Sequence, residues 1–234
     1  MRESGVLMHL SSLPSPYGIG TMGKEAFRFV DFLAKAGQKI WQILPITPTG
    51  YGDSPYQSFS TYAGNPYFID LDYEKLFQNR LPLLKKAAAR FFAAPPKDYE
   101  TFVCEQTAWL EDYALFMSLK TENGGAPWYE WPEEVRRHRY DALQSTYARL
   151  YDDVLFWRFV QYTFYKQWNA LKAYANHSGI EILGDLPIYV AHDSADVWAH
   201  PELFELDEDL NPIEVAGCPP DYFSETGQLW GNPV

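Results

Sequence analysis

The sequence predicts an α/β protein with parallel strands, and three observations support this class. Residues 5–10 form a short apolar run followed at once by Ser and Pro, which is typical of a buried strand. Residues 26–34 carry apolar side chains at the spacing of a helix, and residues 39–45 form a second apolar run. Strand character then returns at residues 180–188. A strand, a helix and a strand joined by short links form a β-α-β unit, so the first two strands should be parallel.

The elements follow one another in a consistent order. The first helix should end before Gly37, because glycine commonly stops helices. Residues 47–66 form a long loop rich in glycine, proline and tyrosine. Loops of this length are usually functional or disordered, and the aromatic side chains favour the functional interpretation.

The middle of the chain changes character. Residues 73–175 lack strand signals, and their patterns predict helices over 83–94 and 99–120, from Pro132 onward, and along an apolar stripe from 154 to 171. The tail from residue 200 is rich in proline and reads as loops. We therefore expect three segments: residues 1–72 with two strands and a substrate loop, a helical insert subdomain at 73–175, and residues 176–234 with a third strand, a connecting segment and a lid loop.

Composition excludes several classes of function. The 234 residues carry a formal net charge of −12, which disfavours binding to nucleic acid or an anionic membrane surface. There is no apolar leader and no stretch of about 18 apolar residues, so we expect a cytoplasmic protein. Cys104 and Cys218 are too few and too far apart for a disulfide framework or a CxxC zinc pair. Aromatic residues reach 17%, which predicts either an aromatic core or platforms for sugar rings.

Several local patterns resemble cofactor or catalytic motifs but are incomplete. Gly18, Gly20 and Gly23 match G-x-G-x-x-G, yet a proline-rich loop separates them from the strand and the acidic residue that should follow is missing. A dinucleotide-dependent oxidoreductase is therefore a weak alternative. The turn at 207–211 begins like a calcium loop, but Pro212 and Cys218 replace its required Gly and Glu.

Two histidine patterns are assigned structural roles. His192, Asp193 and Ser194 are adjacent, so they cannot converge on one substrate atom as a catalytic triad. His9 is interpreted as a core histidine with satisfied hydrogen bonds, although the end of a barrel strand would point it to the active face.

Three segments carry candidate site residues. Residues 51–57 combine two phenols, a carboxylate, a hydroxyl and an amide, which suits either sugar binding or a self-capped turn. Asp185 ends the third strand, where it is either a site residue or a turn former. Residues 219–233 read as a lid with glycine hinges or as a poorly ordered terminus.

Five blocks of this sequence resemble glycoside hydrolase family 77, the 4-α-glucanotransferases. They occur in the family's order and cover nearly the whole chain: Ser12–Gly20, Tyr51–Gln57, Ala63–Tyr67, Gly184–Pro187 with Asp193–Trp198, and Pro219–Pro233. The resemblance implies the N-terminal portion of a TIM-type (β/α)₈ barrel with helical inserts. It also implies transfer of α-1,4-glucan segments between maltodextrins by a retaining mechanism, with two carboxyl groups about 5–5.5 Å apart and no cofactor or metal.

The resemblance assigns substrate contacts by position. It implies that Tyr56 stacks on a sugar ring at the cleavage site with Ser54 beside it, and that Asp185 bonds the bound glucose. Phe223 would lie at the tip of a lid spanning 219–227, and Gln228 and Trp230 would contact the substrate just after the lid. Tyr51 would belong to a second glucan groove. The family's nucleophile and acid/base would lie beyond Val234, so the resemblance implies that this chain needs a C-terminal half and is inactive alone. A non-catalytic glucan-binding fragment and an α-glucan hydrolase on a related barrel are the alternatives.

Overall fold

The computed structural model describes residues 2–16, 18–71 and 76–234, and the side chains of residues 51 and 76–78 lie outside this description. Residue contacts divide the chain into two compact units. The first unit comprises Met1–Ile46, Gly64–Thr107 and Arg158–Leu186, and the second comprises Thr47–Ala63, Ala108–Trp157 and Pro187–Val234. The three consecutive segments expected from the sequence remain a prediction.

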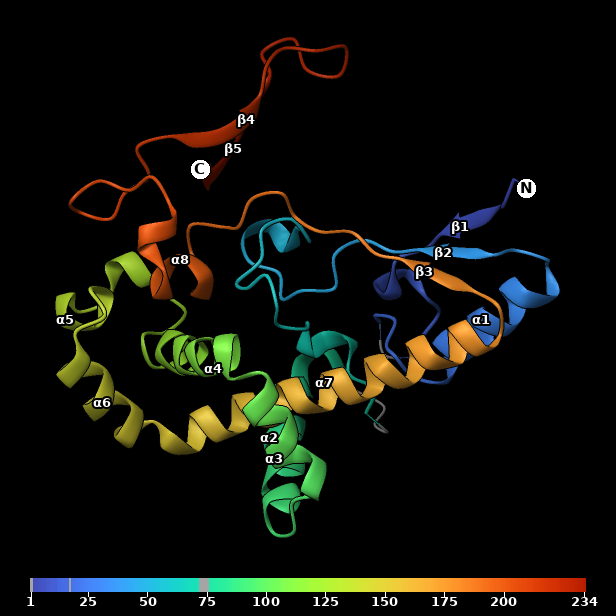
Figure 1. Ribbon diagram of the computed structural model, residues 1–234, viewed down its shortest axis with the longest axis horizontal. Coiled ribbons are helices and arrows are strands. Elements are labelled where there is room, and N and C mark those ends of the chain that lie inside the picture. Colours follow the sequence, from blue (N-terminus) through green and yellow to red (C-terminus); the bar gives the residue numbers. More distant parts are fainter. Residues whose placement is uncertain (1, 17, 72–75) are drawn as a thin grey trace. The chain divides into compact units, whose positions relative to one another are not determined.

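The elements are labelled in Figure 1. The helices are α1 Lys24–Lys35, α2 Leu76–Phe92, α3 Lys97–Glu105, α4 Thr107–Glu122, α5 Glu133–Arg136, α6 Tyr140–Arg149, α7 Tyr151–His177 and α8 Ala195–Ala199, and the strands are β1 Gly5–Leu7, β2 Ile40–Gln42, β3 Glu181–Leu183, β4 Val215–Cys218 and β5 Gln228–Pro233.

The first unit is built on a parallel sheet with the strand order β1-β2-β3. Val6 pairs with Trp41 and Trp41 with Ile182, so this row of side chains shares one face. Trp41 is fully buried and its indole Nε1 donates to the Met8 carbonyl at 2.7 Å. The predicted parallel β-α-β unit is confirmed. Within the described residues the three strands form an open sheet and do not close a barrel.

Helix α1 packs beside the C-terminal part of α7 on one side of this sheet (Figure 1). It buries Ala26, Val30 and Leu33 at helical spacing, and Gly37 follows its end with a φ of +70°. The backbone N–H of Gln38 reaches back to the Leu33 carbonyl at 3.0 Å, which completes the terminal turn. The predicted helix and its glycine stop are therefore confirmed.

Two glutamines of α7 hold the segment that follows the long loop. The Gln161 amide is fully buried; it accepts from the Gly64 N–H at 2.7 Å and donates to the Gly64 carbonyl at 3.1 Å. Gln167 forms the same pair of bonds with the backbone of Asp70, at 2.7 and 3.1 Å. A Cβ on Gly64 would overlap the ring of Phe164, so glycine is required by this close approach. Backbone pairing and packing thus account for Gly64 in the Ala63–Tyr67 block.

Helices α2, α3 and α7 meet through aromatic rings. Phe91 lies 5.1 Å from Tyr99 and 4.9 Å from Phe159, measured between ring centroids. Two predicted boundaries are wrong. The helix expected at 83–94 begins earlier and runs through Pro82. The helix expected at 99–120 is two helices, because the Thr107 hydroxyl donates to carbonyls at the end of α3 and the chain turns there.

The second unit has an aromatic core made largely of tryptophans. The rings of Phe116, Trp131 and Trp198 lie 5.4–5.9 Å apart, and all three side chains are buried. The buried indole of Trp128 donates to the His192 carbonyl at 2.6 Å, and that of Trp198 donates to the Val135 carbonyl at 3.1 Å. Part of the aromatic excess is therefore core, as one of the two interpretations predicted.

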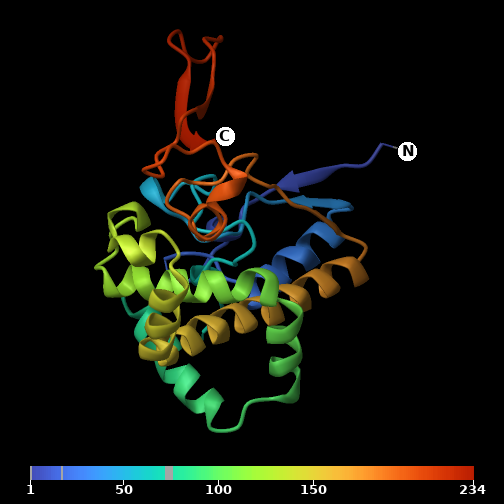
Figure 2. The ribbon, with the colours of Figure 1, turned by 60° about the vertical axis from the view of Figure 1, so that its left-hand side comes forward.

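The tail contains a hairpin that the sequence did not predict. Strands β4 and β5 are antiparallel, and the hairpin projects from the rest of its unit (Figure 2). Glycine and proline at 217, 231 and 233, together with an irregular register between Val215 and Gly217, obscure the alternation that would identify strands. Among the described residues, no helix has both the length and the apolar character needed to cross a membrane.

Candidate functional site

The loop at Thr47–Ala63 presents Tyr56 on a hydrogen-bonded turn. The Gly50 N–H donates to the Gln57 carbonyl at 2.6 Å, and the Gln57 N–H donates to the Ser54 carbonyl at 3.1 Å. The Ser54 hydroxyl accepts from the Tyr56 N–H at 3.3 Å, and Asp53 accepts from the Thr49 hydroxyl at the same distance. Asp53 and Ser54 thus serve the turn, while the Tyr56 side chain is 45% exposed. The self-capped turn is therefore confirmed for Asp53 and Ser54, and sugar binding by Tyr56 stays a prediction.

A chain of side-chain amides joins this loop to β5. Gln57 Nε2 donates to the Asn232 Oδ1 at 2.8 Å and to the Trp230 carbonyl at 3.2 Å. Asn232 is 3% exposed, and its Nδ2 donates to the Val190 carbonyl at 2.8 Å. We call this set of contacts the amide clasp. It brings the segments carrying Tyr56 and Trp230 together within the second unit.

The candidate residues after the lid lie on β5 itself. The Trp230 indole donates to the Gln228 Oε1 at 3.1 Å, and the Trp230 side chain is 43% exposed. The ring of Tyr189 lies 6.5 Å from that of Trp230. Gln228 pairs with Cys218 beside the connecting loop, and Gln57 bonds β5 further along, at Trp230 and Asn232.

Residues 219–227, for which a lid is predicted, form the loop between β4 and β5. The Asp221 carboxylate accepts from the N–H groups of Phe223 and Ser224, both at 2.8 Å, and the Ser224 hydroxyl donates to the Gly227 carbonyl at 2.6 Å. Phe223 and its neighbour Tyr222 are 89% and 97% exposed and pack edge to face. The loop is closed by its own hydrogen bonds and presents two aromatic rings to solvent.

The remaining site residues are Asp185 and Tyr51. Asp185 follows β3 in the first unit, as predicted, and is half-buried. Tyr51 begins a short 3₁₀ turn, Tyr51–Asp53, and its side chain lies outside the described part of the structure.

His9 departs from its predicted role in one respect. It follows β1 at the same carboxyl edge of the sheet as Asp185, and its Nδ1 has no hydrogen-bond partner among the described residues. Burial lowers the pKa of the His9 imidazole, and the ring packs against Phe68 at 5.3 Å. The packing fits a core histidine, but among the described residues Nδ1 lacks the hydrogen bond that the interpretation expected.

The glycine motif near α1 is explained by packing. A Cβ on Gly20 would overlap the Leu10 carbonyl, and one on Gly23 would overlap the Asp70 carboxylate. Asp70 accepts from the Thr21 hydroxyl at 2.7 Å beside the start of α1. A dinucleotide fold places a pyrophosphate at that helix terminus, where a carboxylate would repel it. The geometry therefore contradicts the dinucleotide alternative.

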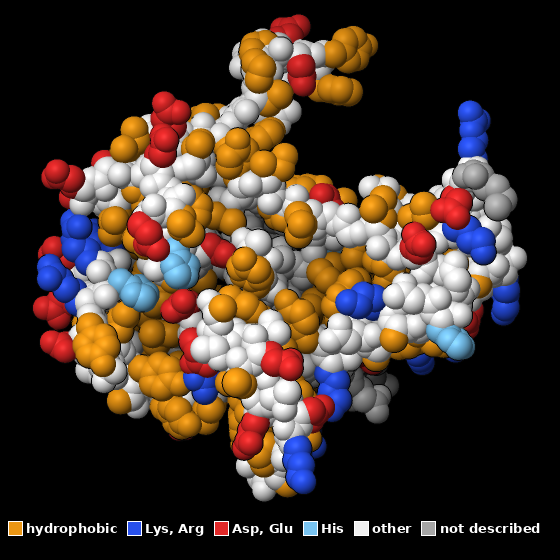
Figure 3. Space-filling view, in the orientation of Figure 1, with side chains coloured by type: hydrophobic (Ala, Val, Ile, Leu, Met, Phe, Trp, Pro, Cys, Tyr) orange, Lys and Arg blue, Asp and Glu red, His pale blue; other side chains and the backbone are white. Residues whose placement is uncertain are grey.

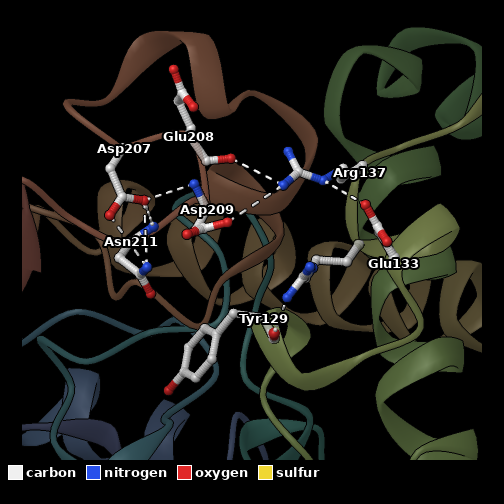
Figure 4. A network of polar contacts seen from close by, with 8 residues as sticks. Tyr129, Glu133, Arg137, Asp207, Glu208, Asp209 and Asn211 are labelled. Atoms are coloured by element: carbon white, nitrogen blue, oxygen red, sulfur yellow. Dashed lines mark hydrogen bonds and ion pairs between the residues drawn. The ribbon is translucent and has the colours of Figure 1, made fainter.

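The acidic turn at 207–211 is a structural turn (Figure 4). Asp207 Oδ1 accepts from the N–H groups of Asp209 and Asn211 at 2.9 and 2.8 Å. Arg137 donates to the Glu208 carbonyl at 3.0 Å and pairs with Glu133 at 3.3 Å, which ties the turn to α5. No group of three or more metal-ligating side chains was found among the described residues.

The sequence His192-Asp193-Ser194 also has separate structural contacts. His192 stacks on Tyr129 at 4.7 Å and contacts the Leu210 carbonyl at 3.0 Å. Asp193 pairs with Lys120 at 2.5 Å, and Ser194 caps α8 by accepting from the Val197 N–H at 3.3 Å. These side chains do not form a catalytic set.

Sequence reasoning missed the residues that hold the candidate segments in place. Asn232 and Gln161 act through buried amide pairs with partners far away in the chain. The only sequence signal was an amide inside an otherwise apolar or glycine- and proline-rich stretch. That signal does not identify a partner, because hydrogen-bond pairing across the fold is not encoded locally.

Comparison with known proteins gives consistent matches along the whole chain. The sequence model of glycoside hydrolase family 77, described as 4-alpha-glucanotransferase, matches residues 8–72 and 70–234. A 4-alpha-glucanotransferase of Thermus thermophilus is 50% identical over 258 residues, covering 100% of this chain and 52% of that protein. One from Clostridium butyricum is 46% identical, covering 97% of this chain and 52% of the relative. The chain thus spans about half the length of these relatives.

Two solved structures resemble the fold. An amylomaltase from Streptococcus agalactiae in complex with acarbose superposes with a TM-score of 0.94 at 44% identity, covering 100% of this chain and 53% of that one. An amylomaltase from Corynebacterium glutamicum gives 0.73 at 17% identity, covering 99% of this chain and 36% of that one, which shows likeness of fold alone.

Proposed function

The chain belongs to glycoside hydrolase family 77, the 4-alpha-glucanotransferases, and from this membership we propose that it forms the N-terminal, substrate-binding part of an enzyme that transfers α-1,4-glucan segments between maltodextrins. The observation that carries the proposal is that some aromatic side chains are buried in the core while others are exposed in the candidate site segments. Trp41, Trp128 and Trp198 are buried, whereas Tyr56, Phe223 and Trp230 are exposed in the segments that the amide clasp and the hairpin bring into one unit.

The open sheet supports a complete barrel in the whole protein. Leu7 pairs with Gln42 and Gln42 with Leu183, and the two leucines are 57% and 51% exposed. This row alternates with the row of Trp41, so it faces away from the buried one. Parallel sheets are normally covered on both faces. Further strands of a TIM-type barrel would enclose these leucines.

The residues of this chain would bind and orient the glucan. The Tyr56 ring offers an apolar face to the C–H face of a glucose ring, and the Asp185 carboxylate can accept hydrogen bonds from sugar hydroxyls. Phe223 would exclude water when its loop lies over the bound sugar, which favours an incoming glucan hydroxyl over hydrolysis. The retaining reaction needs two carboxyl groups about 5–5.5 Å apart, one as nucleophile and one as acid/base. We assign neither to this chain.

The test uses the full-length protein and maltotriose. Transfer gives glucose together with a ladder of longer and shorter glucans, whereas a hydrolase would give shorter products only. Tyr56→Ala should lower kcat/KM about 5- to 150-fold, equivalent to roughly 1–3 kcal/mol. Asp185→Asn should also lower it. The matched control is Tyr140→Ala on α6, because Tyr140 is 72% exposed and belongs to none of the site segments. Wild-type kinetics in both site variants would refute the site assignment.

A second function is favoured for the 234-residue chain on its own. The chain spans half of its relatives and carries the proposed binding residues without an assigned nucleophile. Glucan binding without turnover is therefore its expected behaviour. Calorimetry with maltoheptaose and a product assay on the same sample would check it, and release of glucose by the verified 234-residue chain would contradict it.

A further inference from the structure

A small hollow lies in the second unit and shares no lining residue with the amide clasp. It has a volume of about 40 Å³ and lies between α4, α8 and the end of the loop that carries Tyr56. Its lining includes Ser60, Tyr62, Trp109, Asp112, Asp196 and His200. Over α4 and α8, the surface in Figure 3 shows exposed hydrophobic side chains bordered by acidic ones.

Two aromatic rings form a platform at this hollow. The Tyr62 and Trp109 rings lie 6.2 Å apart with an interplanar angle of 22°, so they present nearly parallel faces. Tyr62 is 56% exposed, although a large aromatic side chain loses stability by facing water. The Ser60 hydroxyl accepts from the N–H groups of Tyr62 and Ala63 at 3.2 and 3.3 Å, and Ser60 is buried. The backbone that carries Tyr62 is therefore held in place.

Hydrogen-bonding groups line the hollow beside the platform. The Asp112 carboxylate lies 3.8 Å from the His200 imidazole, and the Asp196 carboxylate accepts from the Thr61 N–H at 3.0 Å. Both residues are half-buried, and this burial raises the pKa of both carboxyls. Partly desolvated acceptors gain from a hydroxyl donor on a ligand. The same carboxylates would repel an anionic ligand.

We propose that Tyr62 and Trp109 form an additional saccharide subsite, where one glucose residue of an α-1,4-glucan lies on the platform and directs a hydroxyl toward Asp112 and Asp196. The hollow exceeds the roughly 10–15 Å³ that one water molecule needs but is far too small for a sugar ring, so it accepts a hydroxyl group while the ring stays outside. Aromatic faces beside a few convergent polar groups are the usual composition of a ligand site. The choice of a glucan as occupant rests on the proposed function.

The test is affinity electrophoresis of the full-length protein through gels containing soluble starch. Tyr62→Ala should weaken the apparent starch affinity about three- to tenfold, the range expected for loss of one aromatic contact. Asp112→Asn should weaken it in the same direction, because the amide is a poorer acceptor. Tyr140→Ala removes a ring of similar exposure and should migrate as the wild type does. Wild-type retardation of both Tyr62→Ala and Asp112→Asn overturns the proposal.

Kinetics separate this inference from the proposed function. In Tyr62→Ala the KM for soluble starch should rise about three- to tenfold more than the KM for maltotriose, which is too short to reach a second subsite. If the wild type converts maltotriose but both variants bind starch normally, only the subsite is refuted. If the wild type neither converts maltotriose nor binds starch, the proposed function fails. A wild type that converts maltotriose without retardation in starch also refutes the subsite.

Discussion

Asn232 offers a sharp test of how the site is assembled. Its amide donates to the Val190 carbonyl and accepts from Gln57, both at 2.8 Å, and the side chain is 3% exposed. Asn232→Ala leaves both partners without that bond. A buried polar group left unsatisfied costs about 1–3 kcal/mol. Gln57 keeps its bond to the Trp230 carbonyl at 3.2 Å, so the cost at Gln57 falls at the lower end of this range. We expect a total of about 2–4 kcal/mol in the free energy of unfolding.

Asn232→Asp adds a pH signature that simple loss of packing would not show. The new carboxylate would face the Val190 carbonyl, an acceptor against an acceptor, so its folded-state pKa should rise above the usual value of about 3.9. The protonated acid can donate to that carbonyl. The variant's deficit in the free energy of unfolding, relative to the wild type, should therefore shrink as pH falls through the raised pKa and persist above it.

The assay is thermal and urea unfolding of the full-length protein at pH 5 and pH 8, with kcat/KM for maltotriose at the same pH values. Asn169→Asp is the matched control, because Asn169 is exposed on α7 and the change in charge is identical. Both stability and activity should recover in part at pH 5 for Asn232→Asp alone. A deficit that is absent, or equal at the two pH values, would refute the role assigned to the amide clasp.

Three further outcomes are expected. Lys120→Met should destabilise the protein by about 2–4 kcal/mol in urea unfolding, because the nearly buried ammonium pairs with Asp193 at 2.5 Å and its removal leaves that carboxylate without its opposite charge. A change below about 0.5 kcal/mol, typical of surface substitutions, would contradict this. Gly64→Ala should abolish soluble expression or lower the melting temperature strongly, because the new Cβ would overlap the Phe164 ring. Gly184→Ala is the control and should be tolerated, because a Cβ there has no atom within 4 Å. Burial lowers the pKa of the His138 imidazole, so the stability that this residue contributes is present above its unfolded pKa of about 6.5 and is lost as pH falls through the lower folded value. His138→Asn should flatten the fall in melting temperature over that pH range, and asparagine tolerates the φ of +56° at this position. An unchanged pH profile of the melting temperature would contradict the assignment.

Local patterns predicted much of the first unit. The apolar runs at β1, β2 and β3 and the helical spacing of α1 appear in the structure as parallel strands and a covering helix. The hairpin at β4 and β5 did not emerge, because its strands contain glycine and proline and are defined by pairing with each other. The division of α3 from α4 also depended on a side chain, Thr107, that bonds backward to the chain.

The type and position of the candidate site residues were predictable from the sequence, but their hydrogen-bond partners were not. Tyr56 stood out as an aromatic residue within a polar turn, and Asp185 as a carboxylate at a strand end. Their substrate roles remain predictions. The sequence could not separate Gln57, which joins the loop to β5, from Ser54, which bonds its own turn. Both are polar residues in one short segment, and only the fold shows which has a distant partner.

The sequence by itself determined the class of the sheet, the helix that covers it and the family to which the chain belongs, since periodicity and motif order are properties of neighbours along the chain. Tertiary structure alone decided which tryptophans are core and which aromatic rings remain exposed. It also decided which amides join the candidate segments and that the glycines near α1 accommodate Leu10 and Asp70 rather than a phosphate. The physical reason is that burial, steric contact and hydrogen-bond satisfaction depend on atoms brought together from distant positions, and no local pattern specifies those partners.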